Sequence, residues 1–123
     1  MSKNDDVFVY IASIQDTFGK KFMKLCESVQ LKEGLSVEDF LRAGFTNYNE
    51  PILYFCRSVN SDKYCPITFS ITVDKENLKL KEFALLDENF LQPCFCTEKF
   101  YNKSLELLQQ LKNKGILEIK ENG

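Results

Sequence analysis

The middle of the chain alternates apolar and polar residues without a break. The apolar set is Cys65, Ile67, Phe69, Ile71 and Val73, and the intervening set is Pro66, Thr68, Ser70 and Thr72. Successive side chains of an extended strand point to opposite faces, so a period of two residues separates the two sets. This segment therefore predicts a β-strand with one buried face, and the rest of the chain has to cover that face.

Two more strands flank this segment. Ile52–Val59 precedes it, with Asn60–Lys63 as the connection, and Leu78–Leu86 follows it. Short connections between such apolar runs are typical of a three-stranded antiparallel meander. Within the third strand the apolar parity changes, which predicts a β-bulge near Glu82.

The N-terminal third carries an apolar repeat that is close to helical. Its members, spaced by about 3.7 residues, are Val7, Ile11, Ile14, Phe18, Phe22, Leu25 and Val29. We interpret this repeat as one amphipathic helix from about Asn4 to Gln30, with Asn4 or Asp5 as the N-cap. A competing interpretation makes Val7–Ala12 a short strand, because these residue types prefer strands and because Gly19 destabilises a helix interior by about 1 kcal/mol.

A short second helix and a longer C-terminal helix complete the cover. Ser36 and Asp39 match a capping box, and Gly44 is placed to end the short helix after Val37–Ala43. Thr97 is the expected N-cap of the C-terminal helix, which ends at Gly115. The apolar stripe of the C-terminal helix contains Phe100, Ser104, Leu107 and Leu111, with Tyr101, Leu105 and Leu108 beside it.

Two short extended segments remain. Pro93 interrupts the apolar stretch Phe90–Cys96, so we expect an edge strand or an ordered loop there. Ile116–Lys120 is expected to form a short final strand. The fold class is therefore α+β, with N-terminal helices, a central three-stranded antiparallel meander, a C-terminal helix and a short final strand.

Length and composition fit one globular unit. The 123 residues are 44% hydrophobic and include 11 Phe but no Trp, which predicts a single domain, residues 1–123, with a phenylalanine-rich core. The polar start Met1–Asp6 does not resemble a signal peptide, and no apolar run is long enough to span a membrane. We therefore expect a cytoplasmic protein.

The chain contains no histidine, the side chain that most often transfers protons or binds zinc near neutral pH. It also lacks a glycine-rich phosphate loop and a CxxC pair. We expect no enzyme activity, no metal and no cofactor. The formal net charge of −2 gives no broad positive field, so a nucleic-acid partner is not expected either.

The chain contains five cysteines, at positions 26, 56, 65, 94 and 96, which are expected to stay reduced and mostly to fill the core. A two-residue hairpin loop at Asn60-Ser61 would place Cys56 opposite Cys65. A four-residue loop, Asn60–Lys63, would place Cys56 opposite Ile67 instead.

The leading hypothesis for function is the binding of another protein. The candidate residues lie on expected loops, on the polar parity of the strands or on the broken segment before the C-terminal helix. They are Tyr48, Tyr54, Tyr64, Phe90, Leu91 and Phe95. Exposed aromatic side chains and an unpaired sheet edge are common in interfaces, and such a module would act as an adaptor, a chaperone-like protein or an inhibitor, with a homodimer as one form. The alternative is that these side chains cover one end of the core.

Two other functions are open. A small thiol-dependent enzyme or redox protein would use Cys96, because it directly precedes the expected helix N-terminus, where partial positive charge favours a thiolate. A weak binder of single-stranded nucleic acid would stack bases on the aromatic residues of Lys99–Lys103. Adjacent aromatics at the start of an amphipathic helix are more typical of a core.

The order of elements, a helix, a three-stranded meander, a helix and a strand, together with the acidic composition, resembles that of the small secretion chaperones, which bind effectors as dimers. The resemblance covers most of the chain as an order of elements and includes no sequence motif. The short helix Val37–Ala43 and the lack of a final helix depart from that pattern.

Overall fold

The central sheet is built on the predicted meander. The computed structural model describes residues 7–47, 51–60 and 64–120. Within them, β3 (Ile52–Asn60), β4 (Ile67–Asp74) and β5 (Leu80–Asp87) pair in antiparallel order. The alternating apolar side chains of β4, from position 67 to position 73, are all buried. The expected α+β class and the meander are therefore confirmed.

The register between β3 and β4 differs from both expected hairpins. Cys56 lies opposite Ser70, not opposite Cys65 or Ile67. Both expected registers pair an odd-numbered residue of one strand with an even-numbered residue of the other. Such a register would turn Phe55 and its odd-numbered neighbours away from the face that carries the buried row of β4. Burial on one common face selects the observed register.

The predicted bulge in the third strand is present. Thr72 pairs with Glu82 and Val73 pairs with Leu80, so Lys81 is the extra residue on β5. The insertion lets the apolar residues before and after it face the core.

The N-terminal segment is not one helix. Phe8–Tyr10 forms β1, which pairs in parallel with β5, and α1 spans only Thr17–Glu27. The prediction of one long helix is wrong, and the competing prediction of a short strand within Val7–Ala12 is confirmed. Several apolar positions here fit both a helical and an alternating repeat, and the edge of β5 supplies the hydrogen bonds that decide between them. The two residues proposed as caps, at positions 4 and 5, lie outside the described residues.

α1 begins at the loop that follows β1. Asp16 is its N-cap, and the Asp16 carboxylate accepts a hydrogen bond of 2.6 Å from the Gly19 N–H. A Cβ atom on Gly19 would collide with the carbonyl oxygen of Ser13. Gly19 therefore lets the loop close tightly on the first helical turn rather than weakening a helix interior.

The remaining elements follow the sequence more closely. α2 (Val37–Arg42) has the expected capping box, α3 (Glu98–Asn113) begins at its expected N-cap, and β6 (Gln92–Pro93) pairs with the edge of β5. The final strand is present as β7 (Leu117–Ile119). Its partner is β2 (Val29–Leu31), which lies where the long helix was expected to end.

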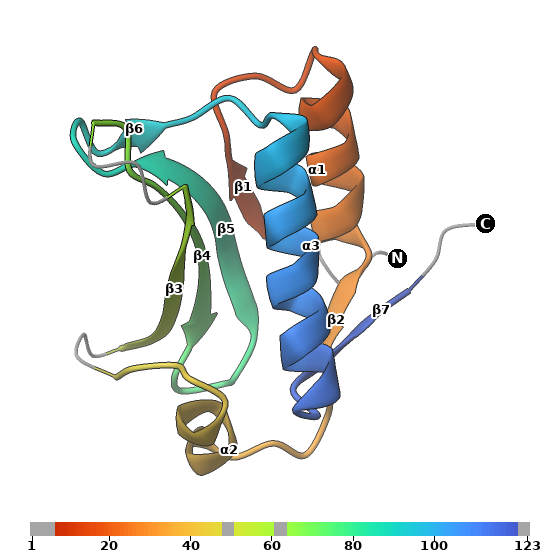
Figure 1. The fold of residues 1–123 in the computed structure, drawn as a ribbon. Helices are drawn as coiled ribbons and strands as arrows, with labels where there is room; N and C mark the ends of the chain where they lie inside the picture. The colour runs from red at the N-terminus through yellow and green to blue at the C-terminus, as the bar shows by residue number, and fades with distance from the viewer. Residues whose placement is uncertain (1–6, 48–50, 61–63, 121–123) are drawn as a thin grey trace.

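Figure 1 shows α1 and α3 side by side on one face of the sheet, both running from the β6 end of the sheet toward the α2 end. In the described part of the chain, no helix covers the opposite face, which we call the open face. The core between helices and sheet contains the buried phenylalanines Phe22, Phe40, Phe45, Phe55, Phe69 and Phe83. The expected phenylalanine-rich core is confirmed. No helix among the described residues is long and apolar enough to cross a bilayer.

Candidate functional site

Four large apolar side chains are exposed at the end of the sheet where β6 lies. Their exposed fractions are 80% for Tyr64, 71% for Phe90, 76% for Leu91 and 59% for Phe95. They come from the β3–β4 connection, the β5–β6 turn and the stretch that leads to α3, which meet at the β6 end of the sheet in Figure 1. We call these four residues the apolar tip.

Hydrogen bonds hold the first two of these segments against each other. The Asn89 side-chain amide donates to the Tyr64 carbonyl oxygen at 3.1 Å, and the Glu88 N–H donates to the Pro66 carbonyl oxygen at 2.9 Å. The Thr68 hydroxyl donates to the Glu88 carboxylate at 2.9 Å. The β5–β6 turn is therefore fixed beside the chain that enters β4.

The β5–β6 turn itself holds Leu91 in a strained conformation. The Asp87 carboxylate accepts the Asn89 N–H at 2.9 Å, and the Leu91 N–H donates to the Asp87 carbonyl oxygen at 2.8 Å. Leu91 then has a φ of 53°, in the left-handed region that favours glycine. Although the backbone fixes this leucine firmly, its side chain is directed mostly into solvent.

Phe95 is exposed because of strand alternation. The Cys94 N–H donates to the Leu85 carbonyl oxygen at 2.9 Å, and the Cys94 carbonyl accepts from the Ala12 N–H at 3.0 Å. These bonds hold Cys94 in extended chain, with Cys94 and Cys96 packed toward the core and Phe95 between them on the other side.

The six candidate partner-binding residues do not form one group. The structure brings together four of them, the apolar tip. Tyr54 lies instead on the open face, where it is half-buried and interacts with Ser70 and Cys56, and burial raises its pKa. Tyr48 lies outside the described residues.

Three exposed apolar side chains were missed by the sequence analysis. Phe8 and Tyr10 of β1 and Ile14 in the loop after it are exposed, and the long helix had assigned Ile14 to its buried stripe. Phe8 lies opposite Glu82 and Tyr10 opposite Ala84, so both belong to the open face. The strand-preferring run Val7–Ala12 was the signal that could have found Phe8 and Tyr10.

Three of the thiols, those of Cys26, Cys94 and Cys96, lie in environments that oppose reactivity. Cys96 directly precedes the N-cap of α3, but burial, with contributions from Asp16 and Cys94, raises its pKa to about 12. Burial also raises the pKa of Cys26 and of Cys94. The described residues contain no group of three or more cysteine and carboxylate side chains that could hold a metal ion. The helix position of Cys96 therefore does not produce the thiolate that the enzyme hypothesis requires.

The aromatic residues of the proposed nucleic-acid motif are partly buried at the border of the core. Phe100 and Tyr101 pack against the buried cluster, and the rings of Tyr101 and Phe18 are 6.0 Å apart. Both side chains are therefore partly used in packing, that of Tyr101 against α1, which leaves less of each ring free to stack bases.

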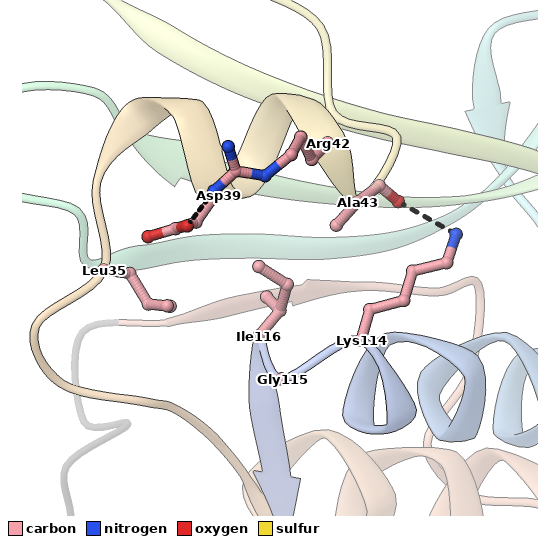
Figure 2. Close-up of a pocket in the computed structure, with 7 residues that line it drawn as sticks. All are labelled: Leu35, Asp39, Arg42, Ala43, Lys114, Gly115 and Ile116. Atoms are coloured by element: carbon pink, nitrogen blue, oxygen red, sulfur yellow. Dashed lines mark hydrogen bonds and ion pairs between the residues drawn. The ribbon is translucent and has the colours of Figure 1, made fainter.

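A slot at the opposite end of the molecule is the second candidate site. It is an open depression between α2 and the turn from α3 to β7, with a volume of about 410 Å³. Figure 2 shows the residues that line it, which are Leu35, Asp39, Arg42, Ala43, Lys114, Gly115 and Ile116. No local sequence pattern marks this site, because its walls come from two segments more than 70 residues apart.

Charged groups of the slot take part in capping both ends of α2. The Asp39 carboxylate accepts hydrogen bonds from the N–H and the hydroxyl of Ser36, at 2.8 and 3.1 Å, and pairs with Arg42. The Ser36 bonds, with a smaller contribution from Arg42, lower the pKa of Asp39. The Lys114 ammonium donates to the carbonyl oxygen of Ala43, the C-cap of α2, at 3.4 Å.

Comparisons with known proteins show the fold only. No protein-family model matches the sequence, and no curated protein matches it. The structure is similar to the crystal structure of a DUF1831 family protein from Lactobacillus plantarum, with a TM-score of 0.61 and 15% sequence identity. The likeness covers 73% of this chain and 84% of that one. At this identity the arrangement of strands and helices is shared, and nothing follows about activity.

Proposed function

We propose that this chain is a non-enzymatic protein-binding module, acting as an adaptor, a chaperone-like protein or an inhibitor, and that it binds its partner through the apolar tip. The observation that carries the proposal is the exposure of Tyr64, Phe90, Leu91 and Phe95 on adjoining segments held by hydrogen bonds. Three aromatic side chains of roughly 200 Å² each and one leucine expose on the order of 600 Å². This equals the largest apolar patches of ordinary monomers and approaches one side of a standard interface.

The rigidity of the β5–β6 turn supports the same proposal. A fixed apolar side chain loses less conformational entropy on binding than a mobile one, so a rigid turn favours affinity. Leu91 keeps a left-handed backbone that glycine would adopt with less strain, and its side chain has few contacts within the chain to compensate. A role in contacting a partner accounts for a leucine at this position.

The edge of β5 favours contact through side chains rather than through an added strand. β1 pairs with β5 from Glu82 to Ala84, and β6 pairs with Leu86 and Asp87. The hydrogen-bonding groups along this edge are thus already used within the chain. A partner at the apolar tip would meet the aromatic and leucine side chains themselves.

Site-specific photocrosslinking tests the proposal. The photoreactive residue p-benzoylphenylalanine replaces Phe90 in one variant and Phe8 in a matched control, because these positions are 71% and 72% exposed. After irradiation in the source cells, we expect the variant at position 90 to give a discrete adduct that the variant at position 8 does not give. An adduct of twice the chain mass would identify the partner as a second copy.

The adduct is then identified and its binding is measured with purified components. The double variant Phe90→Ser, Leu91→Ser is expected to lose at least about tenfold in affinity, as hot-spot residues do. Full affinity in a folded double variant, or identical adducts from positions 8 and 90, would show that the apolar tip is not the binding surface.

A further inference from the structure

We infer that the open face of the sheet binds the open face of a second copy of this chain. Side chains that point to this face form rows across the paired strands. One row contains Tyr54, Thr72, Glu82 and Phe8, and the next row contains Cys56, Ser70, Ala84 and Tyr10. In Figure 1 both long helices, α1 and α3, lie on the other side of the sheet, so within residues 7–47, 51–60 and 64–120 no helix covers these rows.

The two edges of this face differ in exposed side-chain area. On β1, Phe8 is 72% exposed and Tyr10 is 49% exposed. On β3, Tyr54 and Cys56 are half-buried, and Ser70 on the neighbouring β4 is only 2% exposed. The face therefore presents two aromatic rings along β1 and little side-chain area along β3. Adjacent exposed aromatic side chains of this size are typical of contact surfaces.

A second copy complements these unequal edges. In a dimer whose twofold axis lies between the two sheets and runs parallel to the strands, the order β1-β5-β4-β3 is reversed in the facing sheet. β1 of each copy then lies against β3 of the other, so the exposed rings of Phe8 and Tyr10 cover the edge with little side-chain area. Both contacts are identical, and two sheets packed face to face about 10 Å apart are a common way to cover a sheet face.

The charge of the face is compatible with a second copy. Glu82 is the one charged residue in the two rows, all of whose members lie in the described part of the chain. It lies on β5, so the same twofold axis places it against β4 of the second copy rather than against the other Glu82. A nearly neutral face meets its own copy without the repulsion between like charges that would oppose a symmetric contact.

The area of the face is sufficient for a weak dimer. β4 and β5 are each 8 residues long, in a strand order of β1-β5-β4-β3. Four strands spaced by about 4.8 Å and a rise of about 3.3 Å per residue give a face of roughly 19 by 26 Å, or about 500 Å² in projection. Side-chain relief adds to the projected area, so contact between two such faces buries at least about 1,000 Å² in total, the lower limit for a specific interface. We therefore expect a Kd in the micromolar range rather than an obligate dimer.

Sedimentation equilibrium of the purified full chain, from about 1 to about 500 μM, tests the inference. We expect the average mass to rise from one to two chain masses across this range. The double variant Phe8→Ser, Tyr10→Ser should weaken dimerisation at least about tenfold, because it removes the exposed rings. The matched control Phe90→Ser, Leu91→Ser, which removes two exposed side chains of the apolar tip, should leave dimerisation unchanged. A monomer at every concentration, or equal weakening in the two double variants, would overturn the inference.

Photocrosslinking of the purified chain tests which surfaces meet. With p-benzoylphenylalanine at position 8, we expect an adduct of twice the chain mass, with the crosslink in β3 of the second copy when it is mapped by mass spectrometry. Crosslinks to the apolar tip of the second copy, or no adduct under conditions in which the chain sediments as a dimer, would contradict the open-face contact. The residues of the apolar tip belong to neither row, so a monomeric chain leaves the proposed partner-binding function intact, and loss of that function leaves the dimer intact.

Discussion

The exposure of Leu91 can be tested by a pair of glycine substitutions in two turns of the same design. The turn Asp87–Leu91 has a close counterpart in Asp74–Leu78, in which the N–H of the leucine again donates to the aspartate carbonyl oxygen at 2.8 Å. The two leucines have φ angles of 53° and 55°. They differ in packing, because Leu78 is half-buried against the core and Leu91 is 76% exposed. Leu91→Gly and Leu78→Gly therefore change the same backbone in two different environments.

The expected difference follows from packing alone. Each substitution relieves about 1–2 kcal/mol of left-handed strain and adds unfolded-state freedom that costs about 0.5–1 kcal/mol. These contributions cancel between the two variants. Full burial of a leucine side chain stabilises the fold by about 1.5–3 kcal/mol. In proportion to its buried fraction, removing the side chain of Leu91 therefore costs roughly 0.5 kcal/mol of packing free energy, and removing that of Leu78 costs roughly 1.5 kcal/mol. Leu78→Gly should therefore be less stable than Leu91→Gly by about 1 kcal/mol, and Leu91→Gly should match or exceed the parent chain.

Urea unfolding followed by circular dichroism measures both free energies, and the predicted gap equals roughly 4 °C in Tm for a domain of this size. The slope of the unfolding transition should stay the same in both variants, because neither substitution changes the surface exposed on unfolding by much. If Leu91→Gly destabilises the fold as much as Leu78→Gly does, then Leu91 is packed within the chain. In that case the apolar tip loses a member and the proposed interface loses its main support.

Three further predictions concern single positions. Gly19→Ala should lower the free energy of unfolding by about 1–3 kcal/mol in urea titrations, because its Cβ atom collides with backbone; an unchanged midpoint would contradict the close approach. Cys96 has a pKa of about 12, so at neutral pH it should be alkylated at least about a hundredfold more slowly than a small free thiol, as measured by mass spectrometry. Rapid alkylation of Cys96 would instead support the hypothesis of a thiol-dependent enzyme. The pKa of Asp39 is lowered in the folded chain, so its carboxylate stabilises the fold above about pH 4, and this stabilisation is lost as the pH falls through the lower folded pKa. In acid titrations of stability, Asp39→Asn should therefore lose less free energy of unfolding than the parent chain; an identical acid profile would contradict this role of Asp39.

Part of the candidate site could be predicted from the sequence. Pro93 marks a broken apolar segment, and an apolar residue beside such a break has no regular strand or helix to bury it. This reasoning correctly located Phe90, Leu91 and Phe95 on the surface. That Tyr64 joins them depends on the hydrogen bonds between two turns, which no local pattern encodes.

The slot could not be predicted in the same way. Its apolar residues, such as Leu35 and Ile116, look in the sequence like ordinary core positions next to helix ends. The space between them exists because α2 and the α3–β7 turn meet without filling the gap. In the sequence, Gly115 is recognisable only as the residue that ends a helix. That it also lines the slot depends on α2, which forms the other side of the slot.

The sequence by itself determined the elements whose signals are local. Strict alternation specified β4, the capping residues Ser36 and Thr97 specified where α2 and α3 begin, and the parity change specified the bulge at Lys81. Only the tertiary structure decided that Phe8–Tyr10 is a strand, because its hydrogen-bonding partner is β5, more than 70 residues away. It also decided the β3–β4 register, since the burial of both apolar rows against the same helices, rather than the hairpin loop, fixes which residues face each other.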